Sequence, residues 1–179
     1  MTEQSTLRVR RMGEHDLEYV LAWRNHSDVR RFMLTQHEIT ALEHRAWFER
    51  ASKDKTRVLL VVEEHEQPIG CVIFSGVGTN STADWSFYTA PASRAGTGRR
   101  VCSVALAFAF KELGVHKVAG QVLDFNVASI RLHQRLGFIQ EGTLREHSYL
   151  GQKHHDLVCF GLLFNEWLEL IKDRNGYDE

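Results

Sequence analysis

The segment spanning residues 92–100, Ala-Ser-Arg-Ala-Gly-Thr-Gly-Arg-Arg, constrains the fold most, because it joins a predicted strand to a predicted helix. Its two glycines, Gly96 and Gly98, let the backbone approach an anion without side-chain interference. The free amides that open the next helix add the positive end of the helix dipole. The segment therefore predicts a phosphate-binding turn, although a Gly-x-Gly turn is also common as a purely structural joint.

A second motif begins at Asn126, where the chain reads Asn-Val-Ala-Ser-Ile-Arg-Leu-His-Gln-Arg-Leu-Gly-Phe. At about 100° per residue, Asn126, Ser129 and His133 fall on one helical stripe. Charged and amide side chains take the opposite side, so this polar trio is predicted to face the interior or a cleft. Each residue also has a structural interpretation: a helix cap for Asn126, a bond back to the backbone for Ser129, and a core position for His133.

Together the two segments resemble the GNAT family of N-acetyltransferases, which bind acetyl-coenzyme A (acetyl-CoA). The family's pyrophosphate loop, Gln/Arg-x-x-Gly-x-Gly/Ala, is matched by Gly96 and Gly98, with Ser93 in the Gln/Arg place. The later signature, Asn-x-x-Ala/Ser-x-x-x-Tyr-x-x-x-Gly-Phe, is matched by Asn126, Ser129, Gly137 and Phe138. His133 occupies the place of the tyrosine that most often serves as general acid in the family.

The resemblance covers nearly the whole chain and implies one α/β domain over residues 1–179. Its fold is a mixed, mostly antiparallel central sheet with splayed middle strands, flanked by helices. The splayed strands would be residues 84–88 and 117–123, with the pantetheine arm of the coenzyme between them. A chain of 179 residues with 43% hydrophobic content suits one domain with a full core.

Hydrophobic patterning predicts alternating strands and helices. A capping box formed by Thr40 and Glu43 opens one of the helices. The helices are expected over residues 16–24, from 40 onward, over 99–113 and after 126. The strands are expected over residues 7–11, 58–64, 69–77, 84–88, 117–123, 144–149 and 157–163.

The family resemblance also implies the contacts to acetyl-CoA. The pantetheine amides would pair with exposed backbone of the strand before the glycine turn, and the pyrophosphate would lie on the amides of the turn. The residues so implied are Phe87, Tyr88, Thr89, Arg94, Ala95, Gly96, Thr97, Gly98, Arg99, Asn126 and Ser129.

Amide formation from an amine and a thioester needs an uncharged amine, a stabilised oxyanion and a proton for the departing thiolate. Backbone amides near Tyr88 are candidates for the oxyanion site, and the resemblance points to His133 as proton donor. The alternative is that His133 only packs and that Tyr88, Tyr149 or solvent supplies the proton. Asp84 is the candidate base, although a carboxylate at the start of a strand is also typical of a surface residue.

The acceptor is suggested by residues 22–33, together with Ile39 and the aromatic residues near position 47. These resemble the amino-sugar acetyltransferases of the pseudaminic acid pathway, which implies as substrate a UDP-linked 4-amino-4,6-dideoxy-N-acetyl hexosamine of the beta-L-altrosamine type. Such an acceptor needs cations for its diphosphate and an aromatic or apolar shelf. The side chains expected to supply them are Arg30, Arg31, Met33, His44 and Trp47. The structural alternative is that the aromatic side chains are core and the arginines a solvated face.

Two other functions stay open. An acetyltransferase acting on protein N-terminal amines, ribosomal ones included, shares the Glu-Gly-x-x-Arg and His-Asp features at residues 141–145 and 155–156. A non-catalytic acyl-CoA-binding module would account for the missing tyrosine.

Composition narrows the classes of partner. With 22 basic and 23 acidic residues, the chain lacks the cationic excess expected for nucleic-acid binding. It has no apolar run of membrane-spanning length and no signal peptide, which favours a cytoplasmic location. We expect a monomer or homodimer with a small-molecule substrate. His154 and His155 are adjacent on a predicted strand and point to opposite faces, so no metal site is expected.

Overall fold

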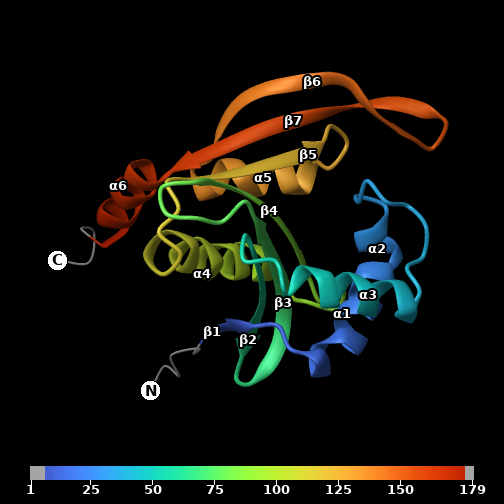
Figure 1. The fold of residues 1–179 in the computed structure, drawn as a ribbon. Coiled ribbons are helices and arrows are strands. Elements are labelled where there is room, and N and C mark those ends of the chain that lie inside the picture. Colours follow the sequence, from blue (N-terminus) through green and yellow to red (C-terminus); the bar gives the residue numbers. More distant parts are fainter. Residues whose placement is uncertain (1–6, 176–179) are drawn as a thin grey trace.

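The computed structural model describes residues 7–175 and contains a seven-stranded sheet with helices on both faces (Figure 1). The strands lie in the order β1-β2-β3-β4-β5-β7-β6. They are β1 (Leu7–Arg11), β2 (Arg57–Glu64), β3 (Gln67–Ser75), β4 (Thr82–Thr89), β5 (Lys117–Leu123), β6 (Ile139–Leu150) and β7 (Lys153–Leu163). The helices are α1 (Leu17–Asn25), α2 (Ser27–Arg30), α3 (Ala41–Ala51), α4 (Thr97–Lys111), α5 (Val127–Leu136) and α6 (Phe164–Asn175). The predicted fold class is confirmed.

The middle of the sheet opens between β4 and β5, its one parallel pair of neighbouring strands. Their ladder runs only from Thr82 paired with Lys117 to Asp84 paired with Ala119. Beyond this point β4 stays paired with β3 up to Thr89, while β5 continues along β7 up to Leu123. The two strands therefore diverge after Asp84, as the predicted splay requires.

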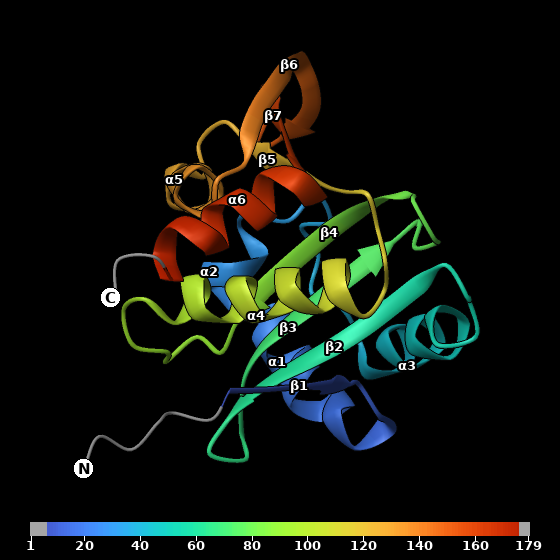
Figure 2. The same ribbon diagram turned by 90° about the vertical axis from the view of Figure 1, so that its left-hand side faces the viewer.

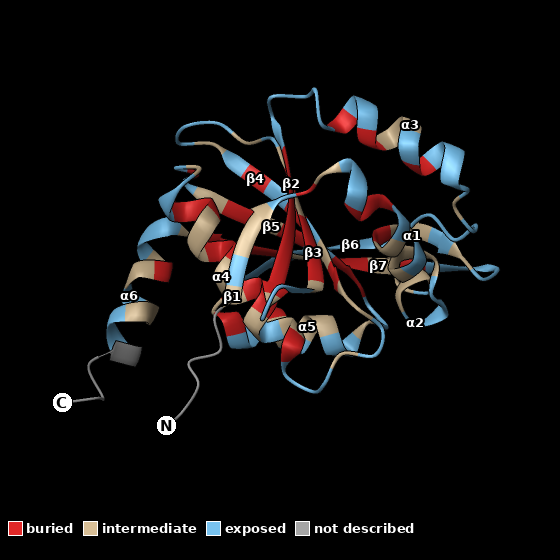
Figure 3. Ribbon diagram, turned by 90° about the horizontal axis from the view of Figure 1, so that it is seen from below, coloured by how far each residue is buried: buried red, intermediate tan, exposed pale blue. Residues whose placement is uncertain are grey.

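Two apolar clusters cover the two faces of the sheet. Along β2, Leu60 and Val62 belong to the cluster under α4, and Leu59 and Val61 to the cluster under α1 and α3. Because side chains alternate along a strand, a run of consecutive apolar residues buries both faces at once. Figure 3 shows the buried residues concentrated on these central strands.

Helices of residues 7–175 are all too short or too polar to cross a membrane.

The sequence predicted most elements but missed two helices. The predicted capping box is present: the Thr40 amide donates to Glu43 Oε2 at 2.7 Å, and the Glu43 amide donates to Thr40 Oγ1 at 3.2 Å. Helix α2 is a single turn, too short to show a helical period. Helix α6 follows β7 with no intervening turn residues, and it is anchored by the buried Trp167, whose ring lies 5.2 Å from that of Phe110.

A charged network fixes β1 to the turn before α1. Asp16 is fully buried, and Arg10 donates to both of its carboxylate oxygens at 2.7 Å. Tyr19 and the Gly13 amide also donate to this carboxylate, and Arg10 reaches Glu63 at 2.6 Å. Burial opposes ionisation of Asp16, but the hydrogen bonds from Arg10, Tyr19 and Gly13 outweigh it and lower its pKa to about 2.

Replacing the buried carboxylate should therefore destabilise the fold. Asp16→Ala is expected to lower the free energy of unfolding at pH 7 by about 3 kcal/mol, because it leaves the Arg10 guanidinium without its main partner. Below the ordinary pKa of 3.8, the stabilisation from Asp16 is lost as the pH falls through about 2. Urea denaturation should show the gap between wild type and variant narrowing with acid. Glu14→Ala, at an exposed neighbouring position, is the control; an equal loss there would contradict the prediction.

Candidate active site

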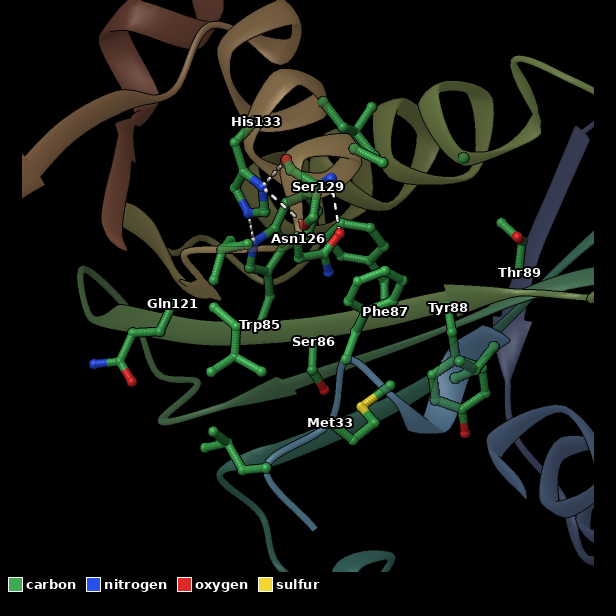
Figure 4. Close-up of a pocket in the computed structure, with 18 of the residues that line it drawn as sticks. Met33, Trp85, Ser86, Phe87, Tyr88, Thr89, Gln121, Asn126, Ser129 and His133 are labelled. Carbon is green, nitrogen blue, oxygen red and sulfur yellow. Dashed lines mark hydrogen bonds between the residues drawn. The ribbon is translucent and has the colours of Figure 1, made fainter. Parts of the chain in front are cut away.

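A cavity of about 320 Å³ lies where β4 and β5 diverge, with α5 above it (Figure 4). It brings together residues that are far apart in the sequence. Those among its lining that the sequence predicted are Met33, Phe87, Tyr88, Thr89, Gly98, Asn126, Ser129 and His133. Both sequence motifs therefore meet at one cavity.

The edge of β4 that faces this cavity has the geometry for an extended ligand. Beyond Asp84, no strand pairs with that edge, because the ladder with β5 has ended. Free amides and carbonyls on a strand edge accept a chain that runs alongside like a further strand. The pantetheine arm of acetyl-CoA carries two amides of this kind, so the opening fits it.

The glycine turn presents backbone to the same cavity. Gly96 is the N-cap of α4 with a φ of 88°, a left-handed conformation that favours glycine. A Cβ on Gly98 would have only Leu132 Cδ2 near it, at 3.6 Å, so this position is open space in the protein itself. The first-turn amides of α4, those of Gly98 and Arg99 among them, have no acceptor within the helix. The turn thus fits a pyrophosphate.

The arginine side chains of the turn lie outside the cavity lining. Arg94 donates to Glu64 at 3.0 Å, and Arg100 reaches the same carboxylate. Arg94, Ala95 and Arg99 are exposed. Their predicted contribution to coenzyme binding is through backbone amides and stays a prediction.

His133 is buried and both of its ring nitrogens are in hydrogen bonds. The indole Nε1 of Trp85 can only donate, so His133 Nε2 accepts that bond at 3.1 Å. Nδ1 then carries the proton and donates to the Ser129 carbonyl at 2.8 Å. Gly120 makes this pair possible, since a Cβ there would lie 2.7 Å from both Trp85 Nε1 and His133 Nε2.

This arrangement bears on the predicted proton donor. Burial lowers the pKa of His133 below its ordinary value of 6.5, partly offset by the hydrogen bond to Ser129. At neutral pH the ring is therefore uncharged, with its one proton directed at a carbonyl and its lone pair at an indole. The general-acid role of His133 stays a prediction, and this geometry favours the structural alternative.

A second cavity of about 590 Å³ lies on the other side of β4, against α3. Met33, Ser86 and Tyr88 line both cavities, so the two communicate at this point. Figure 4 shows Ser86 and Tyr88 pointing away from α5 and towards Met33. An acceptor in the second cavity would thus approach a thioester lying in the first.

The described residues of the second cavity include a partly unpaired cation. Arg24 Nη2 donates to the Thr35 carbonyl at 3.0 Å, while Arg24 Nη1 is buried without a hydrogen-bond partner in residues 7–175. Burial lowers the pKa of Arg24, as expected for a guanidinium that is partly desolvated. A buried donor that lacks an acceptor is costly, and a bound ligand or an ordered water can supply the acceptor.

His44 and Trp47 line the second cavity, as predicted for the acceptor side. Their rings stack at 5.2 Å with an interplanar angle of 20°. Burial and the nearby Arg24 lower the pKa of His44, which leaves an uncharged aromatic surface at neutral pH. The stacked pair offers a surface to a flat or apolar ring, and its role in binding the acceptor stays a prediction.

Three predicted site residues lie elsewhere. Arg30 contacts Glu38 at 3.4 Å, and Arg31 stacks over Phe32 at 4.6 Å. Neither lines the first or the second cavity. Asp84 is exposed and also lines neither cavity. The acceptor role of Arg30 and Arg31 therefore gains no support from the lining of either cavity and stays a prediction.

Arg24 was missed although its signal is present in the sequence. It follows Leu17, Val20 and Leu21 at helical spacing, so a cation stands on the apolar stripe of a predicted helix. Such a residue is either paired or functional.

Among the described residues, no group of three or more His, Cys, Asp or Glu side chains is placed to hold a metal ion.

Comparison with known proteins agrees with this site. The family described as Acetyltransferase (GNAT) domain matches residues 6–139. The SPbeta prophage-derived uncharacterized N-acetyltransferase YokL of Bacillus subtilis is 34% identical over 128 residues, which are 69% of this chain and 71% of that protein. Acetyltransferase PseH of Campylobacter jejuni is 27% identical over 127 residues, 71% of this chain and 79% of that protein.

Solved structures share the same fold. The spermidine N-acetyltransferase of Vibrio cholerae, in complex with CoA and spermine, superposes with a TM-score of 0.84 at 22% identity and covers 90% of this chain and 98% of that one. The chain therefore belongs to the GNAT family of acetyltransferases. It is an acyltransferase that uses acetyl-CoA to acetylate an amine, which overturns the alternative of a non-catalytic binding module.

The glycine turn gives a direct test of the coenzyme site. Gly98→Val should raise the KM for acetyl-CoA by about tenfold or more, equivalent to about 1.4 kcal/mol, because the side chain would occupy the space of the pyrophosphate. The fold should tolerate it, since only Leu132 is near. Calorimetric titration with acetyl-CoA checks the affinity, with Gly142→Val on the exposed strand β6 as control. Equal affinity in a folded Gly98→Val variant would contradict the phosphate-binding role.

Proposed function

We propose that this enzyme acetylates the 4-amino group of a UDP-linked 4-amino-4,6-dideoxy-N-acetyl hexosamine, a step of pseudaminic acid and surface-glycan biosynthesis. The observation that carries the proposal is the buried, unpartnered Nη1 of Arg24 in the acceptor cavity. The 27% identity to PseH supports the same substrate class.

The acceptor cavity suits a sugar nucleotide chemically. A guanidinium binds phosphate through charge-assisted and often bidentate hydrogen bonds, so a diphosphate would satisfy Arg24. The stacked rings of His44 and Trp47 provide a surface for uracil or for the apolar face of the deoxysugar. One anchor for charge and one for a ring orient the acceptor amine towards Tyr88.

The charge of the cavity disfavours a polyamine. Spermidine N(1)-acetyltransferase of Vibrio cholerae is 23% identical to this chain over 171 residues. A polyamine carries several positive charges, and the lining of this cavity holds two arginines, Arg24 and Arg50, against one carboxylate, Glu43. Like charges in a partly desolvated pocket repel, so a polyamine would bind poorly here.

A protein N-terminal amine is the second candidate. The putative ribosomal N-acetyltransferase YdaF of Bacillus subtilis is 38% identical over 66 residues, 37% of this chain. The Glu-Gly-x-x-Arg residues that suggested this class lie on β6, where Glu141 is bound to Lys117 at 2.6 Å, and Glu141 and Arg145 line neither cavity. This feature therefore gives the peptide alternative no support at the site.

Tyr88 is the proton donor in our proposal. It lines both cavities and stands where the thioester would meet the amine. Burial raises the pKa of Tyr88 well above its ordinary value of 10, so the hydroxyl keeps its proton at neutral pH. As the uncharged amine attacks and the C–S bond breaks, this proton would pass to the thiolate of CoA. The proton that leaves the attacking nitrogen would return to the Tyr88 oxygen, directly or through water, and restore the phenol.

Removing the Tyr88 hydroxyl should slow turnover selectively. Tyr88→Phe is expected to lower kcat by about 10²-fold, the usual scale for a general acid, with little change in the KM for acetyl-CoA. Because the pKa of Tyr88 is raised and that of His133 lowered, wild-type kcat should not fall between pH 7 and 9. Steady-state kinetics at saturating acceptor checks both statements, and Tyr149→Phe, exposed on β6, is the control. A kcat that falls as the pH rises towards 7 would return the role to His133, because its imidazolium would lose the proton in this direction.

Arg24→Ala should raise the KM for the sugar nucleotide by about 30-fold, or about 2 kcal/mol, and leave the KM for acetyl-CoA nearly unchanged. Arg31→Ala is the matched control, an arginine of the same segment outside both cavities. Release of free CoA thiol, with UDP-amino sugar, peptide and spermidine each as acceptor, measures the effect. UDP should inhibit competitively against the sugar. Brisk acetylation of peptides, with no inhibition by millimolar UDP, would replace the sugar proposal with the N-terminal amine.

A further inference from the structure

We infer that Phe125 is a positioning residue for the acceptor: it holds Phe32, and so fixes the segment between α2 and α3 across the junction of the two cavities. The inference rests on the proposed function only in that the second cavity receives the acceptor. We call residues 32–39 the strap.

The strap forms a wall of both cavities. Phe32, Met33 and Leu34 line the first cavity, and Met33 also lines the second with Thr35, His37 and Ile39. Met33 thus stands at the junction, facing Ser86 and Tyr88 (Figure 4). The position of the strap sets the width of the passage between amine and thioester.

The end of the strap near α3 is fixed by hydrogen bonds to α1. The side chain of Asn25 accepts from the Ile39 amide at 2.9 Å and donates to the Ile39 carbonyl at 2.7 Å. Arg24 donates to the Thr35 carbonyl at 3.0 Å. These contacts join the strap to the N-terminal half of the chain.

The other end is joined to the opposite side of the opening by an aromatic contact. The rings of Phe32 and Phe125 stack at 5.9 Å with an interplanar angle of 29°. Phe125 belongs to the turn between β5 and α5, whereas α2 and the strap lie beside β4 (Figures 1 and 2). The contact therefore spans the divergent strands at their open end.

Phe125 is itself held in place by charged and aromatic neighbours. The ring of the buried His155 meets it edge to face at 4.6 Å, and His155 Nδ1 lies 3.0 Å from Asp124 Oδ1. The Asp124 amide donates to the Asp156 carbonyl at 3.1 Å. Since Phe125 is 39% exposed, the core does not depend on it, and its ordered ring serves the contact with Phe32.

Two consequences follow for the reaction. With the strap fixed, Met33 narrows the passage and orients the acceptor amine at the thioester, which a loose wall would not do. A fixed strap would also limit access of water to the thioester, which water would hydrolyse to acetate and free CoA.

The experiment compares Phe125→Ala with wild type and with Val127→Ala, a nearby exposed apolar residue that lines neither cavity. Hydrogen exchange should be several-fold faster in peptides that cover residues 32–39 and unchanged in those that cover α4. Hydrolysis of acetyl-CoA without acceptor should rise several-fold. The KM for the acceptor should rise about tenfold while the KM for acetyl-CoA stays within about twofold, and Phe125→Tyr should restore both.

A second variant makes the inference specific. Phe32→Ala should reproduce the faster exchange of the strap and the faster hydrolysis, and the double variant should add nothing to either, because both side chains act through one contact. Unchanged exchange in the strap, or faster exchange throughout the chain, would overturn the inference. Exchange and hydrolysis need no acceptor, so they test it even if UDP-amino sugars prove not to be substrates, which would overturn only the proposed function.

Discussion

The early end of the β4–β5 ladder at Asp84 is the constraint on which the site depends. Two parallel strands that stayed paired would leave no free edge and no opening for a coenzyme. Because β4 remains bound to β3 and β5 to β7, each strand keeps its own partner while the two diverge. The opening therefore costs few buried backbone hydrogen bonds, and its exposed edge is available to an extended ligand.

The Trp85 to His133 hydrogen bond ties the two sides of the opening together at its closed end. It joins β4 to α5 at 3.1 Å, above a position on β5 where only Gly120 leaves room. This explains how a histidine at the position of the family's tyrosine serves the structure. In the proposed mechanism, the proton donor is instead a hydroxyl on the other face of β4, that of Tyr88.

The acceptor side is organised by charge and by shape together. Arg24 brings a buried cation to a cavity whose other wall is the stacked pair His44 and Trp47. Neither feature alone selects a sugar nucleotide, since anions and aromatic rings are common ligands. Their presence in one cavity, open to Tyr88, is the basis on which we propose a nucleotide sugar over a polyamine or a peptide amine.

Local sequence determined the elements and the coenzyme turn, because capping, strand alternation and glycine conformation act within a few residues: Thr40 capped its helix and Gly96 opened α4 as predicted. It did not determine which arginine reaches the acceptor. Arg30 ends a one-turn helix and Arg31 follows it, and the direction of this helix depends on tertiary packing, whereas Arg24 is carried into the cavity by the apolar face of α1. Likewise, the tautomer of His133 is fixed by the hydrogen bond from Trp85, a residue distant in sequence that only the folded sheet brings close.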